Sequence, residues 1–197
     1  MKRSSIASAR AEGLESKGLA TDPARKLTAE LTLRPVQDSD DAFLLKVYGS
    51  TRSQELALVP WTAEQKEQFV RAQFEAQKMH YTAEHPGAAH TVICINGEPA
   101  GRLYLDRCAE GFHILDITLL PEHRNTGAGS LLLRQIMAEA AQAGKPVSIF
   151  VETFNPSLRL FQRLGFTAVQ QEGFHFLMRW SGEFLPKQES LPSSAGG

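Results

Sequence analysis

The chain has 197 residues, of which 42% are hydrophobic and 22% charged, and its formal net charge is -1. This length predicts one domain of ordinary size plus tails, and the composition is typical of a globular protein with a hydrophobic core. The charge argues against a general nucleic-acid binder, and no apolar run approaches the roughly 18 residues of a membrane-spanning helix. Only two cysteines occur, Cys94 and Cys108. Without metal-ligand spacing they predict free thiols, a reducing cytoplasmic location and no bound metal.

The two ends of the chain contribute little to a core. Residues 1–29 are rich in Ala, Ser, Gly and charge, and residues 182–197 are rich in Ser, Pro and Gly. Both ends are expected to be flexible extensions. The start also lacks the continuous apolar core of a secretory signal. The predicted domain therefore spans residues 30–181.

The first part of this domain predicts one strand followed by two helices. Apolar alternation indicates the strand, and Pro35 ends its regular pairing because proline has no N–H to donate. A first helix is expected to give way to a loop at Gly49–Pro60. Thr62 and Gln65 form a capping-box pattern, which predicts a second helix over about 63–81.

An antiparallel meander of three strands is predicted next. Asn96-Gly97 marks its first hairpin, because both positions of that turn tolerate positive φ. A glycine turn and a helix with apolar residues at helical spacing follow, and Gly144 and Pro146 are expected to end that helix. Beyond it come a buried strand parallel to the last meander strand, a short helix and two final strands. The ranges of these expected elements are 91–95, 100–107, 112–120, 146–152, 157–164, 166–171 and 174–180.

The most informative segment is the glycine turn, Arg124-Asn125-Thr126-Gly127-Ala128-Gly129. Backbone N–H groups at the start of a helix have no partner within the helix, and the helix dipole favours negative charge there. Glycines let the backbone approach a ligand closely, so the turn predicts a phosphate site. The Lys-Ser/Thr of a nucleotide P-loop is absent. The glycines also come too late in the chain for a dinucleotide fingerprint, which follows the first strand of a parallel fold.

The order of these elements, with LLPEHRNTGAG followed by VSIFVETFNPSLRLFQRLGF, resembles the Gcn5-related N-acetyltransferase (GNAT) superfamily. The resemblance covers residues 31–180. It implies an α+β fold, with a mixed, mostly antiparallel central sheet of about seven strands flanked by about four helices. It also implies acetyl-CoA as co-substrate and N-acetylation of a small-molecule or protein amine. Many members of the superfamily pair as homodimers.

The resemblance implies roles for particular residues. In the family, Arg124, Asn125, Thr126, Gly127, Ala128 and Gly129 would wrap the pyrophosphate of CoA. Leu119 and Leu120 would present backbone groups to the pantetheine arm, which Asn155 would also contact. The acceptor site would be built from Glu55, Trp61, Tyr81 and Phe174, with Glu55 holding a cationic amine and Trp61 forming an apolar wall.

The catalytic groups are less clearly indicated. Many relatives carry a tyrosine that protonates the departing thiolate, but the matching residue here is Phe161, which has no hydroxyl. His113 falls where several relatives carry a catalytic glutamate, and it is either a base or an exposed strand residue. Asp116 is an acid in an otherwise apolar strand, so it is either functional or paired, for example with an arginine on a neighbouring strand. The alternative to an enzyme is a catalytically silent acyl-CoA-binding regulatory module.

Overall fold

A computed structural model describes residues 30–182, so the predicted extension 1–29 and residues 183–197 of the other extension lie outside the described residues. Seven strands form one sheet in the order β1-β2-β3-β4-β5-β7-β6. The strands are β1 (Leu31–Pro35), β2 (Ala89–Ile95), β3 (Glu98–Arg107), β4 (Phe112–Leu119), β5 (Val147–Glu152), β6 (Thr167–Glu172) and β7 (His175–Trp180). The helices are α1 (Asp41–Ala57), α2 (Ala63–Glu84), α3 (Ala128–Gln142) and α4 (Leu158–Arg163), with short 3-10 turns η1 (Asp38–Asp40) and η2 (Pro121–His123).

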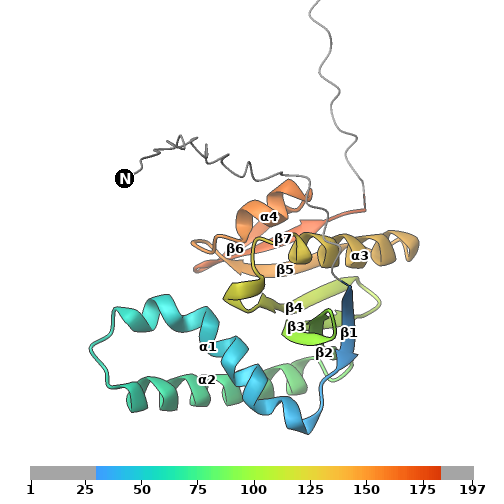
Figure 1. Cartoon of the computed structure of the whole chain (residues 1–197). Coiled ribbons are helices and arrows are strands. Elements are labelled where there is room, and N and C mark those ends of the chain that lie inside the picture. Colours follow the sequence, from blue (N-terminus) through green and yellow to red (C-terminus); the bar gives the residue numbers. More distant parts are fainter. Residues whose placement is uncertain (1–29, 183–197) are drawn as a thin grey trace, which may run out of the picture.

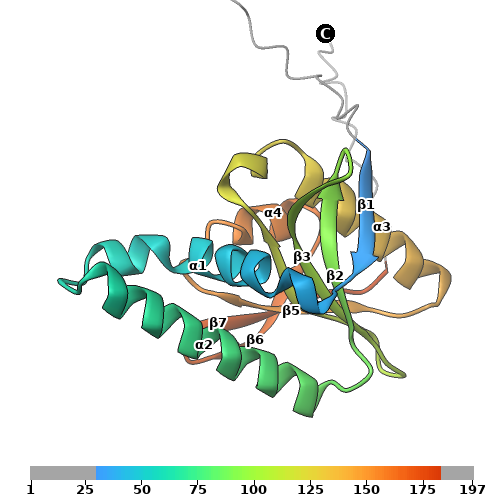
Figure 2. The same ribbon diagram turned by 60° about the horizontal axis from the view of Figure 1, so that its bottom comes forward.

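The sheet separates two helical layers (Figure 1). Helices α3 and α4 pack on one face, whereas α1 and α2 form a hairpin on the other, and the tip of this hairpin projects beyond the sheet (Figure 2). All neighbouring strands pair antiparallel except β4 and β5. The predicted α+β fold, with seven mostly antiparallel strands and four helices, is confirmed.

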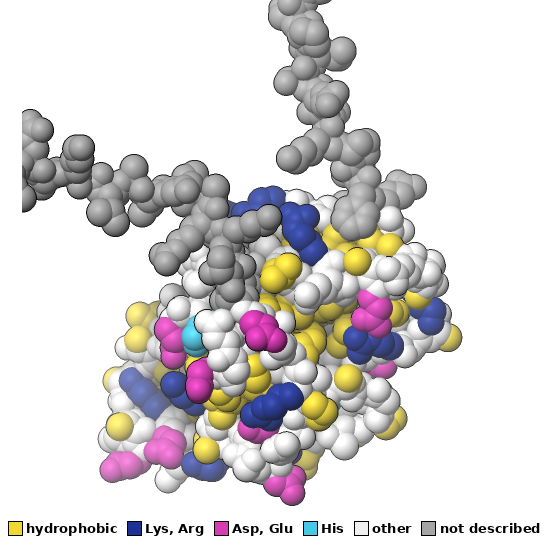
Figure 3. Space-filling view, turned by 45° about the vertical axis from the view of Figure 1, so that its right-hand side comes forward, with side chains coloured by type: hydrophobic (Ala, Val, Ile, Leu, Met, Phe, Trp, Pro, Cys, Tyr) yellow, Lys and Arg dark blue, Asp and Glu magenta, His cyan; other side chains and the backbone are white. Residues whose placement is uncertain are grey.

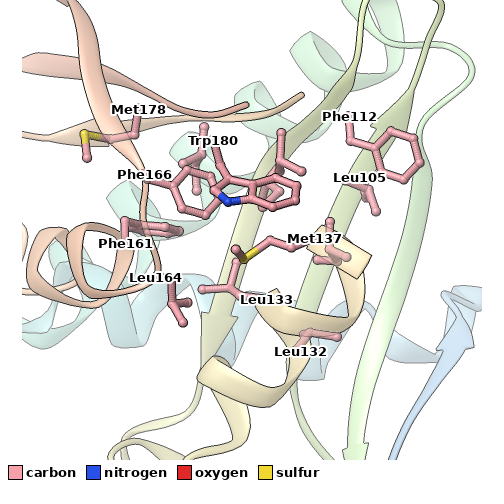
Figure 4. Close-up of a cluster of buried hydrophobic side chains, with 14 of the residues drawn as sticks. Leu105, Phe112, Leu132, Leu133, Met137, Phe161, Leu164, Phe166, Met178 and Trp180 are labelled. Atoms are coloured by element: carbon pink, nitrogen blue, oxygen red, sulfur yellow. The ribbon is translucent and has the colours of Figure 1, made fainter. Parts of the chain in front are cut away.

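The larger core lies between the sheet and the α3–α4 layer (Figure 4). The predicted apolar face of α3 is buried throughout, with Leu132, Leu133, Ile136, Met137 and Ala140 all at most 3% exposed. Trp180 at the end of β7 and Phe166 before β6 join them from the last strands. A second, smaller core fixes α1 and α2 to the other face, and its members are Leu44, Tyr48, Phe74, Val92 and Cys94. The fold therefore has an apolar layer on each side of the sheet.

The expected loop at Gly49–Pro60 is wrong over most of its length, because α1 continues through Gly49 to Ala57. A Cβ at position 49 would lie 3.4 Å from a methyl carbon of Val70 on α2. The missing side chain thus permits close packing of the two helices, which outweighs the low helix propensity of glycine. The capping box of Thr62 and Gln65 is confirmed at the start of α2, and α2 itself extends to Glu84.

Asp40 joins β1 to the start of α1. Its carboxylate accepts hydrogen bonds from both terminal nitrogens of Arg34, each at 2.7 Å, and from the backbone N–H of Gln37 at 2.8 Å. The hydrogen bonds from Arg34, set against burial, lower the pKa of Asp40 from 3.8 to about 2. Asp40 is also the N-cap residue of α1, but its side chain makes no cap hydrogen bond to that helix.

We expect Asp40→Asn to destabilise the fold at neutral pH by about 2 kcal/mol, because it removes a charge-assisted bidentate contact. A folded-state pKa below the unfolded value stabilises the protein above about pH 4, and this contribution is lost as the pH falls toward 2. Urea unfolding at pH 7 and pH 2.5 measures both effects. The variant and wild type should differ at pH 7 and converge at low pH, whereas Asp38→Asn on the exposed side of η1 should match wild type. An equal difference at both pH values contradicts this account.

The parallel pairing of β4 with β5 is confirmed, but it is short. Only three residue pairs connect the strands: Phe112 with Val147, His113 with Ser148, and Ile114 with Ile149. On its other side, β4 has a bulge against β3, where Tyr104 pairs with Asp116 and Leu105 pairs with Ile114, which leaves Leu115 as the extra residue. Bulges bend a strand and increase its local twist. The second half of β4 therefore separates from β5.

Candidate functional site

The glycine turn follows the separated end of β4 and opens α3. Gly127 is the N-cap with φ of 92°, and Asn125 has φ of 60°. The first bond of the helix runs from the N–H of Leu131 to the carbonyl of Gly127 at 3.0 Å. The N–H groups of Ala128, Gly129 and Ser130 therefore have no acceptor within the helix. Together with the dipole of this 15-residue helix, they form a site that favours an anionic group.

Side chains brace this turn. Nε of Arg124 donates to the carbonyl of Leu119 at 2.8 Å, and its Nη2 donates to Oγ of Ser50 on α1 at 3.0 Å. The hydroxyl of Thr126 donates to the carbonyl of His123 at 2.9 Å. The N–H of Leu120 is already engaged, because it donates to the carbonyl of Ala100 on β3. The glycine turn is thus held in place by its own arginine and threonine.

Asn155 and α4 lie on the other side of the separation, after β5. Oδ1 of Asn155 accepts the N–H of Ser157 at 2.9 Å, so the side chain organises the turn before α4. Leu160 of α4 approaches the phosphate turn, since a Cβ at Gly129 would lie 3.8 Å from its side chain. Phe161 is only 2% exposed and packs edge-on against Phe166, with ring centroids 5.4 Å apart (Figure 4). It therefore contributes to the core and offers no proton.

The two catalytic candidates occupy different parts of β4. His113 lies in the paired half, six residues before Leu119, which corresponds to about 20 Å along an extended strand. Its Nδ1 is 2.6 Å from Oγ of Ser148 across the β4–β5 pairing. Asp116 lies in the separated half, and the expected arginine partner on a neighbouring strand is confirmed as Arg102, at 2.5 Å. Both side chains thus have structural partners.

The acceptor candidates lie in three places. Glu55 is near the end of α1, where Arg52 contacts it at 3.2 Å and also contacts Glu152 of β5 at 3.4 Å. Trp61, 41% exposed, lies in the α1–α2 connection and packs edge-on against Phe69.

Phe174, 75% exposed, forms the β6–β7 turn, and its carbonyl accepts the N–H of Thr153 just after β5. Glu55 is therefore linked to the end of β5 through Arg52 and Glu152. Phe174 is linked to the same end through Thr153. Tyr81 is separate from this group, because its hydroxyl donates to the carbonyl of Leu115 at 3.0 Å.

Sequence reasoning missed the most deeply buried polar residue near the separation, Arg102. Its side chain is 0% exposed. Nη2 donates to Asp116 and, at 2.7 Å, to Oε1 of Gln77 on α2. The guanidinium also lies over the rings of Tyr48, Phe74 and Tyr104, with centroids 5.1–5.9 Å from Cζ. The sequence did contain a signal for Arg102. A charged residue inside the apolar run of β3 is as unusual as Asp116 inside β4, and both indicate a buried charge that needs a partner.

The charged side chains and the helices between residues 30 and 182 bear on three other kinds of site: a charged binding surface, a metal site and a membrane span. Acidic and basic side chains are interspersed on the face shown in Figure 3. No three His, Cys, Asp or Glu side chains in this part of the chain are grouped to hold a metal ion. None of its helices combines the length and apolar character needed to cross a bilayer.

Comparison with known families agrees with this geometry. The sequence profile of the acetyltransferase (GNAT) family matches residues 53–166, which include the glycine turn and the segment from Asn155 to Phe166. The chain belongs to the GNAT acetyltransferase family. No match was found among curated protein sequences.

Solved structures of GNAT acetyltransferases share the fold. The PaiA N-acetyltransferase of Thermoplasma acidophilum, solved in complex with coenzyme A, matches with a TM-score of 0.60 and 17% identity, over 77% of this chain and 99% of that one. An acetyltransferase from Thermus thermophilus matches with a TM-score of 0.54 and 22% identity, over 76% of this chain and 96% of that one. The identities are low, so these relatives support the GNAT fold and leave the acceptor open.

Proposed function

We propose that this GNAT protein is an acetyl-CoA-dependent N-acetyltransferase that acetylates a primary amine of a small molecule or protein. The junction between the separated end of β4 and the open N-terminus of α3 carries the proposal. It combines a site for a diphosphate with an adjacent separation between strands for the pantetheine arm.

The residues of the junction fit the parts of the co-substrate. The backbone of residues 124–129 would hold the pyrophosphate, because the free N–H groups at the start of α3 favour anionic oxygen. The separated end of β4 at Leu119 would contact the pantetheine arm, with Asn155 on the opposite side. The carbonyl of Leu119 accepts from Arg124 in this structure. A pantetheine amide would share or replace that hydrogen bond.

The proposed chemistry is direct transfer. The neutral amine nitrogen attacks the thioester carbonyl, a C–N bond forms, the C–S bond breaks, and CoA leaves as a thiolate. Holding both reactants in one site provides much of the acceleration. A thiolate is a tolerable leaving group near neutral pH, so solvent can protonate it in the absence of a hydroxyl at Phe161. Because His113 and Asp116 have structural partners, we assign removal of the amine proton to water in the site.

The charges near the end of β5 favour an amine acceptor. Two carboxylates, Glu55 and Glu152, share the single guanidinium of Arg52. This group carries a net negative charge, which attracts a protonated amine before it loses its proton. The exposed rings of Trp61 and Phe174 offer apolar surface to the rest of the acceptor.

The free thiols of Cys94 and Cys108 support the reducing, cytoplasmic location predicted from the sequence.

The second candidate function is a catalytically silent acyl-CoA-binding regulatory module, favoured by the apolar, buried Phe161. Two measurements on the purified full chain separate the candidates. Calorimetry with CoA should give a dissociation constant below about 1 mM, the upper range of typical enzyme substrates. Release of free CoA thiol from acetyl-CoA, followed across a panel of small primary amines and peptides, should then identify an acceptor. Binding without turnover on any amine favours the module, and absence of binding contradicts both functions.

A further inference from the structure

The backbone of β4 needs new partners where it leaves β5. A strand carbonyl without a ladder partner is costly to bury unless another donor replaces the lost one. Leu115 is the bulged residue and comes directly after Ile114, the last β4 residue paired with β5. Its carbonyl accepts a hydrogen bond from the hydroxyl of Tyr81, a residue of helix α2. A side chain therefore supplies a hydrogen bond to the first residue beyond the β5 ladder.

Further hydrogen bonds extend this contact along β4. Gln77, one turn before Tyr81 on α2, donates from Nε2 to the tyrosine oxygen at 3.3 Å and accepts Arg102 through Oε1. Arg102 in turn binds Asp116, whose other oxygen accepts the hydroxyl of Thr118 at 2.8 Å. The network thus contacts three of the four residues from Leu115 to Thr118. All of them precede the phosphate turn by less than ten residues.

The hydroxyl of Tyr81 remains a hydrogen-bond donor over a wide pH range. Burial, with a smaller contribution from the Asp116 carboxylate, raises the pKa of Tyr81 to about 12. The hydroxyl therefore keeps its proton throughout the physiological pH range. Its ring also packs edge-on against Tyr104 of β3, with centroids 6.0 Å apart. The tyrosine is fixed on both its apolar and its polar side.

We propose that Tyr81 is a positioning residue whose hydroxyl holds Leu115, and with it the separated end of β4, in the conformation that receives acyl-CoA. The inference rests on the proposed function, because it assigns the acyl-CoA arm to that separation. Tyr81 acts through the strand and touches neither substrate. Helix α2 thereby controls the geometry of the CoA site from the opposite face of the sheet.

The test compares Tyr81→Phe with Thr91→Val in the full chain. Both changes remove one hydroxyl that donates to a strand carbonyl, since Thr91 donates to Leu103 at 2.9 Å on the β2–β3 side. Tyr81→Phe should weaken CoA binding in calorimetry by about fivefold to tenfold, as expected for one lost hydrogen bond. It should also accelerate amide hydrogen exchange at residues 115–119 in the ligand-free protein. Thr91→Val should leave both measurements at wild-type values.

Wild-type CoA affinity in Tyr81→Phe overturns the inference. If the acceptor KM is raised at the same time and exchange in β4 is unchanged, Tyr81 is instead an acceptor-binding residue. If Tyr81→Phe does not fold, Gln77→Leu removes the neighbouring contact and should shift both measurements in the same direction. If wild type does not bind CoA, the proposed function fails, and with it the role of Tyr81 at a CoA site. Hydrogen exchange still tests the contact by itself, because unchanged exchange at residues 115–119 in Tyr81→Phe would refute it without any ligand.

Discussion

Gly127→Val should abolish measurable CoA binding while the protein remains folded. Gly127 has φ of 92°, and a β-branched residue in this left-handed region is strained by about 1–2 kcal/mol. The strain is relieved when the turn moves to negative φ, which reorients the N–H groups at the start of α3. Under the proposed function, several hydrogen bonds to the pyrophosphate would depend on that orientation, so we expect at least a roughly hundredfold loss of affinity. Calorimetric titration with CoA measures the effect.

Gly144 provides a matched control for this substitution. It lies after the other end of α3 and also has positive φ (65°). A Cβ added at Gly144, like one added at Gly127, would have no atom within 4 Å. Gly144→Val should therefore lower the melting temperature about as much as Gly127→Val and leave CoA affinity unchanged. Equal CoA affinity in the two variants would count against the phosphate turn.

Arg102→Met should cause the largest loss of stability among single changes near the site, about 3–5 kcal/mol. The change leaves Asp116 without its cation beneath helix α2, although Thr118 still donates to the carboxylate. It also removes the guanidinium from the rings of Tyr48 and Tyr104. Leaving a largely buried carboxylate without its cation is costly. Urea unfolding at pH 7 measures the loss.

Replacing both charged partners distinguishes pairing from a functional need for Asp116. The double variant Arg102→Met/Asp116→Leu should recover most of the lost stability, because apolar replacement of a whole buried pair is often neutral. Arg107→Met, which breaks an exposed pair with Glu139, serves as the control and should cost about 0–1 kcal/mol. If the double variant is no more stable than Arg102→Met, the loss arises from packing around the arginine instead of from the unpaired acid.

Local signals in the sequence predicted the local structure well. Asn96 and Gly97 both adopt the positive φ that their hairpin requires, 54° and 83°. The apolar spacing over 132–140 predicted the buried face of α3, and the position of the glycine turn predicted the open helix N-terminus. These features depend on residues close in the chain, so propensity, periodicity and turn chemistry are sufficient to find them.

Features that depend on distant residues could not be predicted in the same way. The continuation of α1 through Gly49 depends on Val70 of another helix. The contacts of Arg102 with Gln77, and of Tyr81 with Leu115, join residues 25 and 34 positions apart. The residue types alone give no information on which of these side chains meet. The acceptor candidates Glu55, Trp61 and Phe174 remain a prediction for the same reason, since each comes from a different element.

The three residue pairs between β4 and β5 also bear on how the chain folds. Within residues 30–182 they are the only ladder contacts between strands β1–β4 and strands β5–β7, and α3 is the segment that joins the two groups. Within the second group, β5, β6 and β7 lie within 34 residues of sequence, and β2, β3 and β4 form a similarly local meander. Apart from β1, which pairs with β2 across helices α1 and α2, the strands of each group close only short loops when they pair, which favours rapid assembly. We therefore expect the two groups to acquire structure independently, with the packing of α3 against both as the step that unites them.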